Sequence, residues 1–154
     1  MSNGIKVKKR DGRIESLDLD KMHLMVDEAC QGLAGVSASQ VEMKSGIQFY
    51  DGITTEEIQE ILIKAASDLI DLDHPNYQFV AARLLLFALR KQLYGKMREL
   101  PHLEPHIMNC TNIDVYDKEI FAKYSKEEID KANSFIDHER DFLFTYAGLR
   151  QVVD

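Results

Sequence analysis

Hydrophobic residues recur at helical spacing over four segments of the chain, and two short runs typical of strands precede them. Residues 5–10 and 13–17 flank Asp11-Gly12, a dipeptide that supplies the positive backbone angles of a tight hairpin turn. The pattern therefore predicts two short antiparallel strands followed by four helices.

The first two predicted helices have recognisable starts. Asp18 can cap the first helix, which ends near Gly32 and Gly35. Its apolar positions recur at steps of three and four and comprise Met22, Met25, Val26, Ala29, Cys30 and Leu33. The second helix starts at Ser37, where Ser-Ala-Ser-Gln fits a capping box, and stops near residues 50–52, Tyr-Asp-Gly.

The third predicted helix has the clearest pattern. Residues 54–57, Thr-Thr-Glu-Glu, form a capping box, and one apolar stripe follows, made of Ile58, Ile61, Leu62, Ala65 and Leu69. Pro75 fits the first turn of a fourth helix that runs to about Met97. The pattern therefore predicts a mainly α fold, in which a small hairpin is followed by four helices.

Three lysines are candidates for an anion site. Lys91 interrupts a helix stripe that is otherwise apolar or aromatic, and a lone lysine there is usually explained by a long stem that covers apolar surface. Lys9 on the first strand and Lys21 in the first helical turn favour a binding role for Lys91 over this explanation, because converging lysines suit a polyphosphate. The open amide groups near Thr55 offer a further contact, although a satisfied helix cap explains the same residues.

Composition excludes several classes of protein. The chain has 154 residues, 45% of them hydrophobic, and a formal net charge of -7, which suits one or two soluble domains and argues against a general nucleic-acid binder. No apolar run approaches the roughly 20 residues of a membrane span, and no signal peptide is evident, so we expect a cytoplasmic protein with no membrane partner. Cys30 and Cys110 form no CxxC pair, which fits a reducing compartment and argues against structural zinc.

Other candidate sites are weaker. His102 and His106 are four residues apart, a step compatible with metal binding, but Pro101 and Pro105 disturb the helix and no third ligand is placed. The acidic and histidine side chains of residues 138–141 suit a solvated helix face. We therefore predict no metal site and no catalytic residue.

Several long stretches occur together in one order: residues 7–12, 15–21, 47–53, 63–66 and 77–91. They resemble the ATP-cone that opens the large (alpha) subunit of class I ribonucleotide reductase. Residues 124–129, 135–141 and 144–148 resemble the helical segment that links this cone to the catalytic barrel. The resemblance implies a short β-hairpin lid over a four-helix domain at residues 1–97 and further helices at residues 98–154. The similarity spans nearly the entire chain, and several ordered motifs are far more specific than one short motif.

The resemblance implies a regulatory nucleotide site. In this family the cone binds ATP or dATP, with Mg²⁺ allowed, and ATP keeps the enzyme on while dATP favours an inhibited oligomer. The matching positions imply nucleotide contacts at Lys9, Glu15, Ser16, Leu17, Asp18, Leu19, Asp20, Lys21, Thr55 and Lys91. Glu15 is explained almost as well as a solvated strand residue. Gln59 stands where some relatives have a histidine next to the nucleotide, which leaves open the preference between ATP and dATP or the number of nucleotides bound.

The resemblance also implies what this chain lacks. Reduction in this family uses a radical cysteine, a redox cysteine pair and a tyrosine path on a barrel much longer than this chain. Cys30 lies on an apolar stripe and Cys110 has no partner at redox spacing, so we expect no catalysis by this chain alone. Four phenylalanines are interpreted as packing surface, internal or for the barrel: Phe121, Phe135, Phe142 and Phe144.

The chain resembles an amino-terminal piece, either a shortened subunit or one product of a split gene. In the second case the remaining large-subunit polypeptide docks against residues of about 100 to 154. The resemblance further implies the reductase small (beta) subunit as a partner and allows a homo-oligomer.

Three hypotheses follow. The first is the allosteric ATP/dATP-binding part of ribonucleoside-diphosphate reductase, which makes deoxyribonucleotides for DNA synthesis. The second is a helical docking module of a split subunit without nucleotide binding. The third, a nucleotide-sensing transcriptional repressor with the same cone, is weakened because its cysteine-rich zinc ribbon is missing.

Overall fold

The computed structural model describes residues 4–154, which divide into two compact units. The first unit extends to Leu89 and also includes Phe142–Asp154, and the second contains Arg90–Asp141. The predicted fold class, mainly helical with a small sheet near the amino terminus, is confirmed. The domain division after residue 97 stays a prediction.

A three-stranded sheet contains the predicted hairpin. Strands β1 (Lys6–Lys8) and β2 (Ile14–Ser16) pair antiparallel, and both are shorter than predicted. Gly12 alone in the turn has a positive φ, of 85°, and its amide donates to the Lys9 carbonyl at 2.9 Å. The expectation that Asp11 shares the left-handed conformation is wrong, because the turn spans more residues than a two-residue hairpin loop.

The third strand, β3 (Ile53–Thr54), was not predicted. It pairs parallel with β1, so β1 lies in the centre of the sheet in the order β2-β1-β3. Two residues are too short to show the alternation of a strand in the sequence. The pairing sets Lys8 opposite Thr54, directly before the third helix.

Among residues 4–154, five helices belong wholly or mainly to the first unit: α1 (Leu19–Cys30), α2 (Ala38–Gly46), α3 (Thr55–Ser67), α4 (Tyr77–Tyr94) and α8 (Tyr146–Val153). The Asp18 cap of α1 is confirmed, since its carboxylate accepts from the Lys21 amide at 2.9 Å. The capping box of α3 is also confirmed.

Several predicted helix boundaries are wrong. Helix α1 ends at Cys30 instead of Leu33, and α2 ends at Gly46 instead of residues 50–52. Ser37 precedes α2 but makes no side-chain capping bond, and its amide instead donates to the Tyr77 hydroxyl at 3.0 Å. Helix α4 begins two residues after Pro75 and ends at Tyr94, before the predicted Met97.

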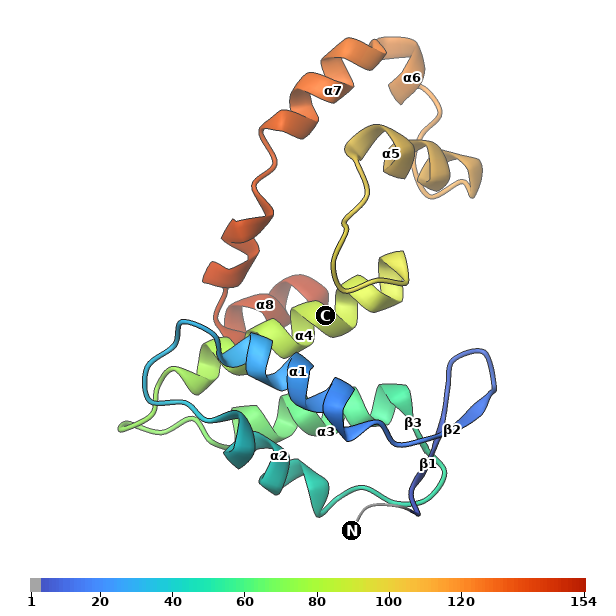
Figure 1. Ribbon diagram of the computed structural model, residues 1–154. Helices are drawn as coiled ribbons and strands as arrows, with labels where there is room; N and C mark the ends of the chain where they lie inside the picture. The colour runs from blue at the N-terminus through green and yellow to red at the C-terminus, as the bar shows by residue number, and fades with distance from the viewer. Residues whose placement is uncertain (1–3) are drawn as a thin grey trace. The chain divides into compact units, whose positions relative to one another are not determined.

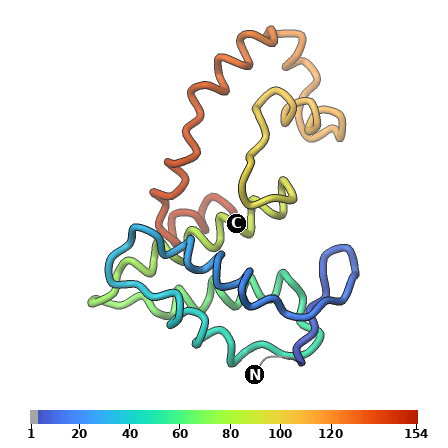
Figure 2. The backbone as a smooth tube through the Cα atoms, viewed as in Figure 1, coloured from blue at the N-terminus to red at the C-terminus, as the bar shows by residue number. Residues whose placement is uncertain are grey.

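The core of the first unit positions the hairpin. Fully buried side chains come from α1, α2, β3, α3 and α4, and include Val26, Val41, Ile53, Leu62, Ile63, Tyr77, Val80 and Phe87. The ends of α1 and α3 that face the sheet are their amino-terminal ends (Figure 1). Figure 2 follows the chain from the projecting hairpin loop through β2 into α1.

The second unit is built from short helices: α5 (Leu103–Asn112), α6 (Ile120–Lys123), α7 (Lys126–Ser134) and most of the 3-10 helix η1 (His138–Leu143). Pro105 lies in the first turn of α5, where a missing amide is tolerated, so the prediction that it disturbs the helix is wrong. Over residues 4–154, none of the helices has the length and apolar character needed to cross a membrane.

Candidate functional site

The hairpin turn is fixed over the first turn of α3. The β1–β3 pairing ends at Lys8 and Thr54, so Lys9 follows directly beside the start of this helix. The Arg10 guanidinium forms an ion pair with Glu56 in the first turn of α3. The Thr55 hydroxyl lies 3.5 Å from the Lys8 carbonyl oxygen. These contacts bring the predicted residues Lys9 and Thr55 to one end of the unit.

Glu15 joins two cations across the hairpin. Its carboxylate lies 3.4 Å from the Lys9 ammonium and 3.1 Å from the Arg13 guanidinium. Arg13 also pairs with Asp11 at 2.7 Å, which lowers the pKa of that carboxyl and raises the pKa of Arg13. The Lys9 side chain is 27% exposed, and its ammonium is paired with the Glu15 carboxylate. A bound anion would compete with Glu15 for Lys9.

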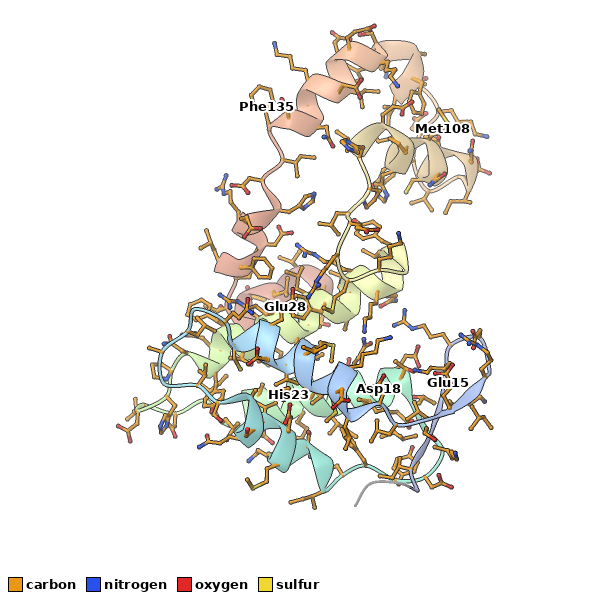
Figure 3. The ribbon with its side chains drawn as sticks, viewed as in Figure 1. Glu15, Asp18, His23, Glu28, Met108 and Phe135 are labelled. Carbon is orange, nitrogen blue, oxygen red and sulfur yellow. The ribbon has the colours of Figure 1, made fainter. Side chains whose placement is uncertain are left out.

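The segment from β2 to α1 has mostly structural contacts. The Ser16 hydroxyl accepts from the Lys6 ammonium at 3.0 Å, and the Leu17 amide donates to the Ile5 carbonyl at 3.0 Å. Asp18 uses a carboxylate oxygen for the α1 cap. Figure 3 shows Glu15 and Asp18 on successive parts of this segment. Within residues 4–154, the exposed Lys21 ammonium makes no ion pair or hydrogen bond, so it is open to a ligand.

Gln59 is a buried polar side chain on the same face of α3 as Thr55, one turn further on. It is 6% exposed, and its Nε2 atom has no hydrogen-bond partner in the part of the chain that the structure describes. Leaving such a donor unpaired costs about 1–3 kcal/mol. An unpaired buried amide beside a helix start is suited to an acceptor atom supplied by a ligand.

The capping box of α3 includes a tyrosine. The Glu57 carboxylate accepts from the Thr54 amide and hydroxyl and from the Tyr50 hydroxyl, at 2.8 to 2.9 Å. The bond from the Thr54 amide is the largest cause that lowers the pKa of Glu57, and the bond to Glu57 raises the pKa of Tyr50. The loop that leads into β3 is thereby fixed to the start of α3.

Two of the predicted nucleotide contacts line a separate cavity. Leu19 and Asp20 line a cavity of about 760 Å³ between α1, α2 and the segment before β1. His23 and Glu42 also line it and lie 2.7 Å apart, and this hydrogen bond raises the pKa of His23. Lys9, Glu15, Lys21, Thr55 and Lys91 do not line this cavity.

Lys91 lies in the last turn of α4 and is half-buried. It belongs to the second unit, whereas Lys9 and Lys21 belong to the first. Its convergence with those two lysines stays a prediction.

The cysteines and the two histidines of the α5 region, His102 and His106, have contacts typical of structural residues. Burial is the largest cause that raises the pKa of the Cys30 thiol to about 11, which makes this thiol a poor nucleophile at neutral pH. The His106 ring packs edge-on against Tyr94 and Tyr116. His102 Nδ1 lies 3.2 Å from the Asn133 side-chain amide. The two histidines therefore have different neighbours.

Known proteins share extensive sequence with this chain. A family model described as ATP cone domain matches residues 5–92. The alpha subunit of ribonucleoside-diphosphate reductase 1 from Escherichia coli (strain K12) is 47% identical over 99% of this chain and 20% of that subunit. The alpha subunits from Haemophilus influenzae and from Enterobacteria phage T4 are 46% and 43% identical over 99% and 96% of this chain, or 20% and 19% of their own lengths. The chain thus spans about a fifth of the length of these relatives.

Proposed function

Because the chain belongs to the ATP-cone family, we propose that it is the allosteric part of a ribonucleoside-diphosphate reductase large subunit and binds ATP or dATP as an effector. The proposed contacts are Lys9, residues 16–21, Thr55 and Lys91, while Glu15 holds Lys9 in competition with the phosphate. In this proposal the chain binds the effector and transmits its signal to the rest of the subunit.

The single observation that carries the proposal is the arrangement at the start of α3. The Arg10 guanidinium of the hairpin pairs with Glu56 in the first turn of this helix, and Lys9 lies next to Arg10 in the chain. The buried Gln59 amide one turn further along the helix has no partner within residues 4–154. Helix amino-terminal ends favour anions, and ammonium groups suit phosphate oxygens. A triphosphate beside Lys9 would pair with its ammonium group. An acceptor atom of the base or ribose beside Gln59 would accept a hydrogen bond from the unpaired amide.

Regulation then follows from linkage. ATP and dATP differ by one hydroxyl group, so the triphosphate supplies most of the affinity for both. The effectors regulate only if each binds two assembly states with different affinity. A difference of about 1–3 kcal/mol between the states changes their ratio roughly 5- to 150-fold.

Titration calorimetry with ATP and dATP, with and without Mg²⁺, tests the proposal. We expect saturable binding of both nucleotides, weakened at least about tenfold by Lys9→Ala and by Lys91→Ala, because each loses a charge-assisted contact to phosphate. Lys44→Ala is the matched control, since Lys44 is an exposed lysine on α2. Circular dichroism checks that each variant keeps its helical content.

A second candidate function is a docking module that binds no nucleotide. The exposed apolar side chains of the second unit, such as Phe135, favour it. Absence of heat and of a thermal shift with either nucleotide would support this candidate and contradict the effector proposal.

The proposed partners are the rest of a reductase large subunit and its small subunit, as in the relatives that carry the alpha-subunit name. We propose a cytoplasmic location, where the unpaired thiols of Cys30 and Cys110 suit a reducing environment. A self-assembled oligomer is the form in which an inhibitory effector would act.

A further inference from the structure

Residues 142–154, named the return segment, belong to the same compact unit as the hairpin and the start of α3. The matching ATP-cone family model covers residues 5–92 and therefore does not include them. Most of the return segment is helix α8, whose start is capped by the Thr145 hydroxyl, which accepts from the Gly148 amide at 3.2 Å. Leu149 of α8 is buried. The return segment is thus a packed part of the unit that holds the candidate site.

One end of the return segment is attached to α1 through Arg83 of α4. Helix α1 has no basic residue in its last turn, and the Arg83 guanidinium instead donates to the Ala29 and Gln31 carbonyls at 3.2 and 2.7 Å. A cation is favourable at the carboxyl-terminal end of a helix. The same guanidinium lies 5.4 Å from the centre of the Phe142 ring, which packs edge-on against Phe87. A displacement of α1 therefore changes the surroundings of Phe142.

The other end of the return segment is attached to α3 through Arg150. The Arg150 guanidinium lies 3.3 Å from the carboxylate of Glu60, the residue directly after Gln59. It also lies 3.8 Å from the carboxylate of Asp154 on its own helix. Because one ion pair near the surface can replace the other, the Arg150–Glu60 contact breaks at little cost in free energy. Such a contact responds to a small shift of α3.

Both attachments are made to helices that begin at the candidate site. Helix α1 follows the Asp18 cap and carries Lys21, and α3 begins at Thr55 and carries Gln59. A regular helix is a rigid element, so a ligand that fixes its start also fixes the residues further along it. We propose that binding of the effector at the starts of α1 and α3 strengthens the attachment of the return segment to both helices.

The identity of the effector in this inference rests on the proposed function. Linkage makes the coupling reciprocal, so loss of the Arg150–Glu60 contact weakens ATP binding by the same factor by which ATP strengthens that contact. A contact that served only the stability of the fold would lower the Tm when removed and leave the Kd of the folded chain unchanged.

Titration calorimetry with ATP on Glu60→Gln, Arg150→Gln and the double variant tests the coupling. We expect the Kd to rise roughly two- to fivefold in each single variant, the range that an ion pair near the surface supports, and to rise no further in the double variant. Asp68→Asn is the matched control, since it removes an ion pair with Lys64 that lies within the α3 region. An unchanged Kd in both single variants, or an equal rise in the control, would overturn the proposal.

A fluorescent reporter follows the return segment itself. The chain has no tryptophan, so Phe142→Trp gives a single emission signal beside Arg83. This emission should change with ATP at the calorimetric Kd, and adding Lys9→Ala should move the response to at least about tenfold higher ATP concentration. Phe135→Trp, at an exposed position of the second unit, should give no response.

Hydrogen exchange measured by mass spectrometry follows α8 without any substitution. Amides of residues 146–153 should exchange at least about threefold more slowly with ATP, because binding suppresses their local opening, while residues 126–134 of α7 should not change. Equal exchange of residues 146–153 with and without bound ATP would overturn this inference alone. A parent chain that binds no ATP would overturn the proposed function as well.

Discussion

Gln59→Met removes the buried amide that we propose to contact the nucleotide. Gln59 is 6% exposed, and its Nε2 atom has no partner within residues 4–154. Methionine has a similar length and volume and carries no strong polar group that needs a partner, so the change removes an unpaired donor without opening a cavity.

The expected change in folding stability of Gln59→Met follows from two opposing effects. Removing an unpaired buried donor stabilises the folded chain by about 1–3 kcal/mol, and imperfect repacking costs less than about 1.5 kcal/mol. The net gain without nucleotide is about 1 kcal/mol, which raises the Tm by roughly 2–4 °C for a chain of this size. The variant also loses one hydrogen bond to ATP, of about 0.5–1.5 kcal/mol, which raises the Kd roughly two- to tenfold.

Scanning calorimetry with and without ATP, together with titration calorimetry, measures both effects. Gln92→Met is the matched control, because Gln92 is an exposed glutamine on α4. The Tm advantage of Gln59→Met should narrow as ATP is added, since the parent chain gains more from binding. A lower Tm without nucleotide, or an unchanged Kd, would refute the assignment of the unpaired amide.

Three further predictions concern the surroundings of the site. Thr54→Ala should destabilise the chain by about 0.5–2 kcal/mol in urea unfolding because it removes the capping box of α3, and Ser37→Ala, which loses no capping bond, should cost clearly less. The raised pKa of His23 means that its pair with Glu42 stabilises the fold below the ordinary value of 6.5 and is lost as pH rises through the raised value. The Tm gap between the parent chain and His23→Asn should therefore be largest below pH 6.5 and shrink as the pH rises above it, and a gap that widens with pH would contradict the pairing. Glu15→Gln should tighten ATP binding in calorimetry, because the carboxylate no longer competes for the hairpin lysine. Weaker binding would instead indicate that Glu15 contacts the nucleotide.

Helix starts were predictable where the deciding contact is local. Asp18 and the Thr54–Glu57 pair bond backbone groups three residues away, so the residue types alone indicate them. The start of α2 shows the limit of such reasoning, because the Ser37 amide bonds to the Tyr77 hydroxyl, far along the chain. No local pattern contains that contact.

Some contacts of the candidate site were predictable from local sequence and others were not. Lys9 and Glu15 approach each other because the hairpin folds the chain back, and the Asp11-Gly12 turn predicts that fold. The pairing of β1 with β3 and the Arg10–Glu56 ion pair depend on packing between distant segments. The sequence also could not predict that the Gln59 amide is unpaired, since burial of one amide atom depends on the whole core.

The most direct measurement follows the lysine side chains themselves during ATP binding. Reductive methylation with carbon-13 keeps the charge of each lysine and gives each one an NMR signal. The signals of Lys9, Lys21 and Lys91 should shift with one common Kd as ATP is added, while that of Lys44 stays in place. Saturation of the protein with ATP without a shift at Lys9 or Lys91 would contradict a shared triphosphate site.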